Sequence, residues 1–105
     1  MATFLVVLFR SGPGWDPSLP LEEQSDWPAH AGFMEGLVAT GFVVLGGPLA
    51  DEETVVLAVE AGSETEVRAT LALDPWSDSH LVIDRVDAWK IRLDGRTASG
   101  PPPLT

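Results

Sequence analysis

Cysteine is absent from the 105 residues of this chain. Its absence excludes disulfide bonds, a thiolate nucleophile and a zinc site built on cysteine ligands. Basic residues are scarce: 6 Lys and Arg stand against 16 Asp and Glu, which gives a formal net charge of -10. This charge repels phosphate backbones and anionic membrane surfaces, so nucleic acid and membranes are poor partners. The acids are scattered, which favours a solvated surface over a dedicated cation site.

Long apolar runs are also missing. The first apolar run, residues 4–9, is too short to cross a bilayer, and no basic leader stands before it. We therefore expect a cytoplasmic protein. P-loop, dinucleotide-binding and nucleophile-elbow motifs do not occur, and the glycine-rich runs are interpreted as turns.

The pattern of apolar residues predicts one α+β domain, because one core of ordinary size fills this length. Strands and helices are distinguished by alternating and helical spacing, respectively. The predicted strands are 3–9, 42–45, 54–61 and 82–93, and the predicted helices are about 21–40 and 63–74. The resulting order, β-α-β-β-α-β, is that of a ferredoxin-like, four-stranded antiparallel sheet with both helices on one face.

Local signals define the ends of the helices. Pro28 predicts either a fresh start with Asp26 as N-cap or a kink, and Gly41 is a plausible C′ residue. Ser63 and Glu66 form a capping-box pattern that opens the second helix. That helix is expected to stop at the residue before Pro75.

The sheet is expected to be apolar on both faces. In strands 3–9 and 54–61, apolar residues occupy both the odd and the even positions, which point to opposite faces of the sheet. The helices cover only one of these faces. The other face should bury against a second copy, so we expect a homodimer. Residues 1–93 form the predicted domain, and residues 94–105, which are rich in proline, are predicted to be a flexible tail.

His30 is the residue that most strongly indicates a functional site. It lies on the apolar stripe of the first predicted helix, and Asp74 is the best candidate partner. A carboxylate holds an imidazole in one tautomer and raises its basicity, which suits the pair to general acid/base chemistry. The competing interpretation is a buried structural histidine whose carboxylate partner only ends a helix.

Three motifs resemble the YciI-like family, also called the YCII-related domain, of the dimeric α+β barrel superfamily. They are WPAH at residues 27–30, GFVVLGGPL at residues 41–49 and DPW at residues 74–76. The resemblance covers roughly residues 3–93, and its specificity comes from the order and spacing of the motifs. It implies a ferredoxin-like protomer, a dimer with facing sheets, a His30–Asp74 pair in a pocket, and no fixed cofactor. Dehydrochlorination of a chlorinated hydroquinone-type ring is the family's clearest enzymatic precedent.

Other residues are candidates for binding a substrate. Trp76 and Trp27 are large rigid rings that suit the walls of a flat cavity, although core packing explains Trp27 equally well. Gly46 and Gly47 would let a ligand approach the backbone, with amides to hold an oxyanion, or would mark a bulge. Further candidates, each with a plainer structural interpretation, are Phe33 and Met34 (core), and Ser11 and Trp15 (a solvent loop in place of a lid).

His80 has two interpretations. With His30 and Asp74 it would complete a set of two histidines and one carboxylate for a metal. The spacing does not require this, so we predict no metal site and an exposed loop histidine.

These observations lead to a functional hypothesis and two alternatives. The hypothesis is a small cofactor-independent enzyme that uses His30 and Asp74 for proton abstraction, with elimination or isomerisation of an aromatic or enolisable substrate. The first alternative is a small-molecule-binding or regulatory module without turnover. The second is an interaction protein that uses its sheet face and tail.

Overall fold

The computed structural model describes residues 1–96 of the chain. The β-α-β-β-α-β order predicted from the sequence is confirmed, with one additional short 3-10 helix, η1. The elements are β1 (Ala2–Phe9), η1 (Leu21–Glu23), α1 (Trp27–Ala39), β2 (Val43–Pro48), β3 (Thr54–Ala61), α2 (Glu64–Leu71) and β4 (Val82–Ala88). Residues 97–105 of the predicted tail lie outside the described part. No helix within residues 1–96 has the length and apolar character that crossing a membrane requires.

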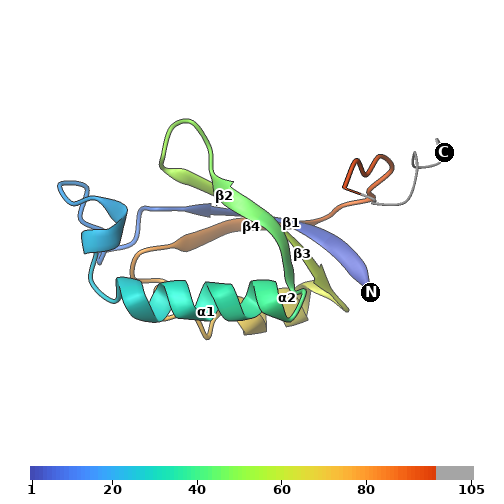
Figure 1. The fold of residues 1–105 in the computed structure, drawn as a ribbon, viewed down its shortest axis with the longest axis horizontal. Coiled ribbons are helices and arrows are strands. Elements are labelled where there is room, and N and C mark those ends of the chain that lie inside the picture. The colour runs from blue at the N-terminus through green and yellow to red at the C-terminus, as the bar shows by residue number, and fades with distance from the viewer. Residues whose placement is uncertain (97–105) are drawn as a thin grey trace.

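The four strands form one antiparallel sheet in the order β2-β3-β1-β4. Both helices lie on the same side of this sheet (Figure 1). The core is formed mainly by the strand positions that face the helices, together with residues of α2 and the turn after it. Its members include Val6, Val59, Val67 and Trp76, which are the largest fully buried side chains. The helix-facing residues thus alternate with residues that point to the uncovered face.

The first helix begins later than predicted. Residues 21–23 form η1, and Gln24 then adopts an extended conformation, so α1 starts afresh at Trp27 with Pro28 in its first turn. Of the two alternatives for Pro28, the fresh start is therefore the one observed. Asp26 occupies the N-cap position with a left-handed φ of 60°, but its side chain makes no capping hydrogen bond. Gly41 follows the helix with φ 84°, as expected of a C′ glycine.

The second helix follows its capping signals. The Ser63 hydroxyl accepts a hydrogen bond from the Glu66 amide at 3.1 Å. The Glu66 carboxylate accepts from the Gly62 amide, so the box closes one residue before the N-cap. The helix ends at Leu71, and a turn carries the chain on to Asp74, which hydrogen-bonds through its amide to the Leu71 carbonyl at 3.1 Å.

The last strand is shorter than predicted. It ends at Ala88, not Leu93, because its only neighbour in the sheet is β1 and Ala88 already pairs with Phe4. The Trp89 amide still donates to the Thr3 carbonyl at 2.9 Å, but few residues of β1 remain beyond that point. The alternation at positions 89, 91 and 93 therefore does not mark a strand, and these three apolar side chains are 38–71% exposed.

Candidate functional site

His30 and Asp74 form a buried pair. Asp74 lies in the turn after α2, and His30 lies in the first turn of α1, where its amide donates to the Asp26 carbonyl at 3.0 Å. The His30 Nδ1 is 2.8 Å from Oδ1 and 2.9 Å from Oδ2 of Asp74. Both residues are 8% exposed. The turn that follows a helix thus brings its carboxylate to the start of a helix 44 residues earlier in the chain.

The pairing fixes how the imidazole can act. An ionised carboxylate only accepts hydrogen bonds, so Nδ1 carries the proton of the neutral ring and Nε2 carries the lone pair. Within residues 1–96, the hydrogen bonds of His30 are made by Nδ1 and the backbone, and Nε2 makes none. Nε2 is also not fully buried. Nε2 is therefore a ring nitrogen with a lone pair and no hydrogen-bond partner within residues 1–96, which is the arrangement that a general base requires.

Trp76 holds both members of the pair. Its ring stacks on the His30 imidazole with centroids 4.0 Å apart and planes 6° apart. Its amide donates to Oδ1 of Asp74 at 2.9 Å, and its indole Nε1 donates to the Ser25 carbonyl at 2.8 Å. Trp76 is 1% exposed, so the surrounding side chains hold its ring in this position. One residue thus fixes the imidazole plane through its ring and the carboxylate through its backbone amide.

His80 is not the exposed loop residue that was predicted. It is 2% exposed and stacks on Trp76, with centroids 4.6 Å and planes 7° apart. The loop after β1 covers it, since a Cβ at Gly12 would collide with the Ser79 carbonyl and one at Gly14 would crowd the His80 ring. The prediction was wrong because this loop and the turn at 77–81 are far apart in sequence. The signal in the sequence was the pair of glycines, which allows close approach of the two segments.

The surroundings of His80 favour its neutral form. Its Nε2 lies 3.0 Å from the Ser25 hydroxyl, and its Nδ1 lies 2.8 Å from the Ser79 hydroxyl. Burial lowers the pKa of His80 below its ordinary value, and the nearby His30 acts in the same direction, although Asp26 and Asp74 oppose the change. Hydroxyl groups can donate or accept, so both partners suit a neutral imidazole.

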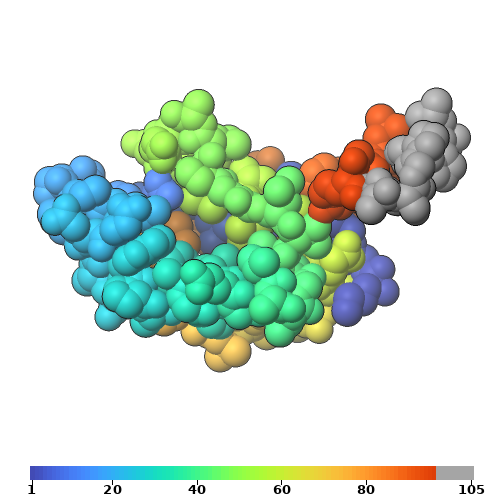
Figure 2. Space-filling view, in the orientation of Figure 1, coloured from blue at the N-terminus to red at the C-terminus, as the bar shows by residue number. Residues whose placement is uncertain are grey.

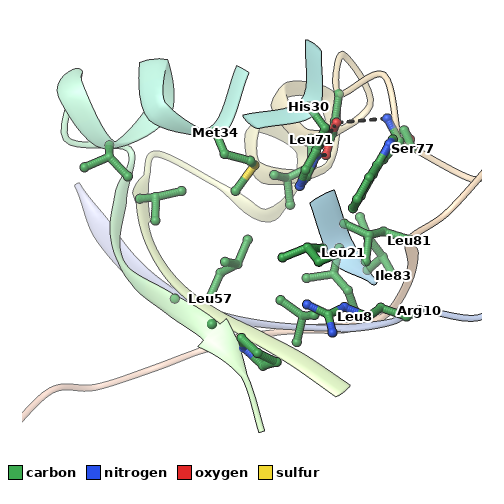
Figure 3. Close-up of a pocket in the computed structure, with 18 of the residues that line it drawn as sticks. Leu8, Arg10, Leu21, His30, Met34, Leu57, Leu71, Ser77, Leu81 and Ile83 are labelled. Atoms are coloured by element: carbon green, nitrogen blue, oxygen red, sulfur yellow. Dashed lines mark hydrogen bonds and ion pairs between the residues drawn. The ribbon is translucent and has the colours of Figure 1, made fainter. Parts of the chain in front are cut away.

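A pocket of about 440 Å³ opens between α1 and the sheet. Figure 2 shows the molecule hollowed between α1 and the β2–β3 hairpin, and Figure 3 shows the side chains that line the hollow. Its volume lies in the range of small-molecule sites, and most of its lining is apolar. His30 is the one α1 residue that is buried. The apolar side of this helix therefore forms a wall of the pocket and is not closely packed against the sheet.

The structure brings most of the predicted binding residues to this pocket. The lining includes His30, Asp74, Trp76, Trp27, Met34, Gly46 and Gly47. Phe33, in contrast, is half-buried and is not among the lining residues. Gly46 lies so close to Leu57, which also lines the pocket, that a Cβ at position 46 would collide with the Leu57 side chain.

The two glycines are part of β2 itself, and a register irregularity lies just before them, between Val43 and Leu45. The Leu49 amide donates to the Thr54 carbonyl at 2.8 Å. Because hydrogen-bonded pairs alternate along an antiparallel ladder, Gly46 occupies a position whose N–H points away from β3 at the open edge of the sheet.

Sequence reasoning missed one residue at the site, Arg10, and considered Trp15 only as part of a lid or a solvent loop. Arg10, directly after β1, also lines the pocket. Trp15, in the loop considered as a lid, packs edge-on against Trp76 with centroids 5.9 Å apart. Neither belongs to a motif, and both reach the site through the path of the chain after β1. Ser11, from the same loop, is exposed.

A metal centre has little support within residues 1–96, where no group of three or more His, Asp or Glu side chains is placed to hold an ion. His30 and His80 lie on opposite faces of the Trp76 ring and do not converge.

Sheet order, helix placement and pairing together define a ferredoxin-like α+β protein, as expected from the sequence. Among solved structures, the fold is similar to that of 5-chloro-2-hydroxyhydroquinone dehydrochlorinase (TftG) from Burkholderia phenoliruptrix, in complex with 2,5-dihydroxybenzoquinone. The TM-score is 0.54 at 20% sequence identity, over 90% of this chain and 99% of the other. No protein-family model and no curated protein sequence matches the chain. At this identity the likeness establishes the fold.

Proposed function

We propose that this protein is a small cofactor-independent enzyme of the YciI-like family in which His30 is the general base or acid. The observation that carries the proposal is the His30–Asp74 pair, with Nδ1 within 2.9 Å of both carboxylate oxygens and Nε2 left accessible at an apolar pocket. The similar fold of a dehydrochlorinase and the three motifs at residues 27–30, 41–49 and 74–76 support it.

The proposed reaction is proton abstraction from an enolisable or phenolic ring, followed by elimination or isomerisation. Nε2 of His30 takes the proton, and the electron pair of the broken bond enters the ring or its oxygen. In an elimination, chloride then leaves with the pair of its carbon–chlorine bond, so that the overall loss is HCl. Asp74 stabilises the imidazolium, and the Gly46 amide at the sheet edge is the proposed donor to the developing oxyanion.

We further propose that the protein is a homodimer. The uncovered face of the sheet carries the cross-strand pairs Leu5–Ala58 and Val7–Val56. The helices lie on the other side, so neither of them provides a cover for these apolar residues (Figure 1). A second copy packed face to face would supply it.

The test is turnover of 5-chloro-2-hydroxyhydroquinone, with chloride release measured by ion chromatography and products by mass spectrometry. We expect His30→Asn and Asp74→Asn each to reduce turnover by about 100-fold or more, because each removes the base or its stabilising charge. Glu35→Gln, an exposed change on α1, is the matched control and should retain full activity. Equal rates for wild type and His30→Asn would contradict the proposal. A substrate that raises the melting temperature without being consumed would favour the binding-module alternative.

A further inference from the structure

The pocket contains a buried cation that proton transfer by His30 does not use. The Arg10 side chain is 9% exposed, and Arg10 is the one Arg or Lys among the residues that line the pocket. Figure 3 places it on the sheet side of the pocket, across from His30 on α1. A guanidinium group is always charged at physiological pH, so the pocket carries a permanent positive charge.

One nitrogen of the Arg10 guanidinium group, Nη1, is held by Glu52. Its Nη1 donates to the Glu52 carbonyl at 2.7 Å and lies 3.4 Å from the Glu52 carboxylate. Its guanidinium carbon lies 5.1 Å from the centroid of the Trp15 ring, close enough for a cation–π contact. The Arg10 amide also donates to the Glu53 carbonyl at 2.9 Å. The turn between β2 and β3 and the loop after β1 therefore fix where this charge lies.

The other edge of the guanidinium group lacks a partner. Nε is the one buried side-chain nitrogen or oxygen in residues 1–96 without a hydrogen bond. The hydrogen bonds of the guanidinium group within this part of the chain leave from Nη1. Buried polar groups are normally hydrogen-bonded, so an unsatisfied Nε calls for an acceptor. Nε and Nη2 form the edge of the planar fork that suits two oxygens of an anion.

The surroundings make an anion the fitting ligand. The chain carries a net charge of -10, which repels anions at long range, so their capture depends on a local cation. Two carboxylates also border the pocket. Asp74 is engaged by His30, whereas Asp78 is exposed to solvent, where its repulsion is screened.

We propose that Arg10 binds an anionic oxygen substituent of the substrate, either a carboxylate or an ionised ring oxygen, through its Nε–Nη2 edge. The substrate class is then an anionic ring compound, held by its charged end on the sheet side while its reacting carbon faces His30. The reference to a substrate rests on the proposed function. The anion site itself rests on the burial of the Arg10 side chain and on its Nε, which has no hydrogen-bond partner within residues 1–96.

Binding of three probes by isothermal titration calorimetry tests this assignment without turnover. The probes are para-hydroxybenzoate, its neutral match para-hydroxybenzamide, and 2,5-dihydroxybenzoquinone, which carries ionised ring oxygens. We expect at least one anion to bind wild type about 10- to 100-fold more tightly than the amide, and Arg10→Gln to lose that advantage. Glu52→Gln, which keeps the guanidinium and its carbonyl partner, should change each Kd by less than about threefold.

The variants separate this site from the catalytic proposal. His30→Asn should keep the anion Kd, so a variant that retains both binding and turnover would defeat the proposed function and leave the Arg10 site standing. Anions and amide binding equally, no anion binding to wild type, or an unchanged anion Kd in Arg10→Gln would each overturn the Arg10 site. Should circular dichroism show Arg10→Gln unfolded, Arg10→Lys replaces it. The lysine keeps the charge but loses the fork, so a several-fold weaker anion Kd supports the site and an unchanged one overturns it.

Discussion

Trp76 connects the residues of the site to one another. Its two ring faces contact His30 and His80, and its two N–H groups bind the Asp74 carboxylate and the Ser25 carbonyl. Two imidazoles on one indole are placed in different environments. His30 hydrogen-bonds to a carboxylate, whereas His80 hydrogen-bonds to hydroxyl groups and is sealed from solvent. This difference in environment fits the proton-transfer role proposed for His30 and a packing role for His80.

His80 should make the protein sensitive to mild acid. Its pKa is lowered in the folded state, chiefly by burial, so below its ordinary value the unfolded chain binds the proton more readily. The free energy of unfolding must then fall as pH decreases below about 6.5, by at most about 1.4 kcal/mol per pH unit for this one proton. Urea denaturation of wild type and His80→Asn between about pH 7.5 and 5 measures the difference. The variant should show the shallower loss, and parallel curves would show that His80 does not contribute.

Among the strands and helices, β2 has a special part in shaping the pocket. It is an edge strand whose irregularity falls between Val43 and Leu45, and Gly46 after it keeps the space in front of Leu57 open. Gly47, the next residue, has no atom near where a Cβ would lie. A side chain at position 46 would therefore meet Leu57, whereas one at position 47 would have free space.

This difference gives a paired prediction. Gly46→Ala should destabilise the protein by about 1–3 kcal/mol, because the new methyl group collides with Leu57 and forces a shift. It should also weaken binding of pocket ligands. Gly47→Ala is the control and should leave both quantities close to wild type. Thermal unfolding and calorimetry with the three probes measure them, and equal behaviour of the two variants would contradict this description of β2.

The sequence was informative about the elements where local signals decide the outcome. The Ser63–Glu66 pattern predicted the start of α2, and the glycine at 41 predicted the end of α1. Where a long-range partner decides, the sequence was insufficient. The end of β4 depends on where β1 begins, and the burial of His80 depends on a loop more than 60 residues earlier. The His30–Asp74 contact was predicted because His30 is a polar residue on an apolar stripe and because the motifs at 27–30 and 74–76 resemble those of a family with a His–Asp pair, whereas Arg10 belongs to no periodic pattern.

For the whole molecule, the two faces of the sheet have different roles. One carries the core and the pocket, and neither helix covers the other (Figure 1). Val7 on that open face is 6% exposed, and its cross-strand partner Val56 is half-buried. A flat apolar centre of this kind suits a self-complementary interface.

Sedimentation equilibrium should therefore give twice the mass of one chain. Val56→Glu places a charge at the centre of the open face, beside Val7, and should reduce the mass to that of a monomer while circular dichroism stays unchanged. Leu73→Glu is the control, since this leucine is 73% exposed after α2, and it should leave the dimer intact. A monomeric wild type would refute the dimer without affecting the His30 site.

The clustering of tryptophans at the pocket has an optical consequence. Trp15 and Trp27 have ring centroids 5.9 and 5.7 Å from that of Trp76, while the fourth tryptophan, Trp89, is 45% exposed beyond the end of β4. Transition dipoles this close couple strongly, since the coupling falls with the cube of their separation. Trp76 is thus coupled to both Trp15 and Trp27, and the circular dichroism of these indoles reports on the wall of the pocket without any attached label.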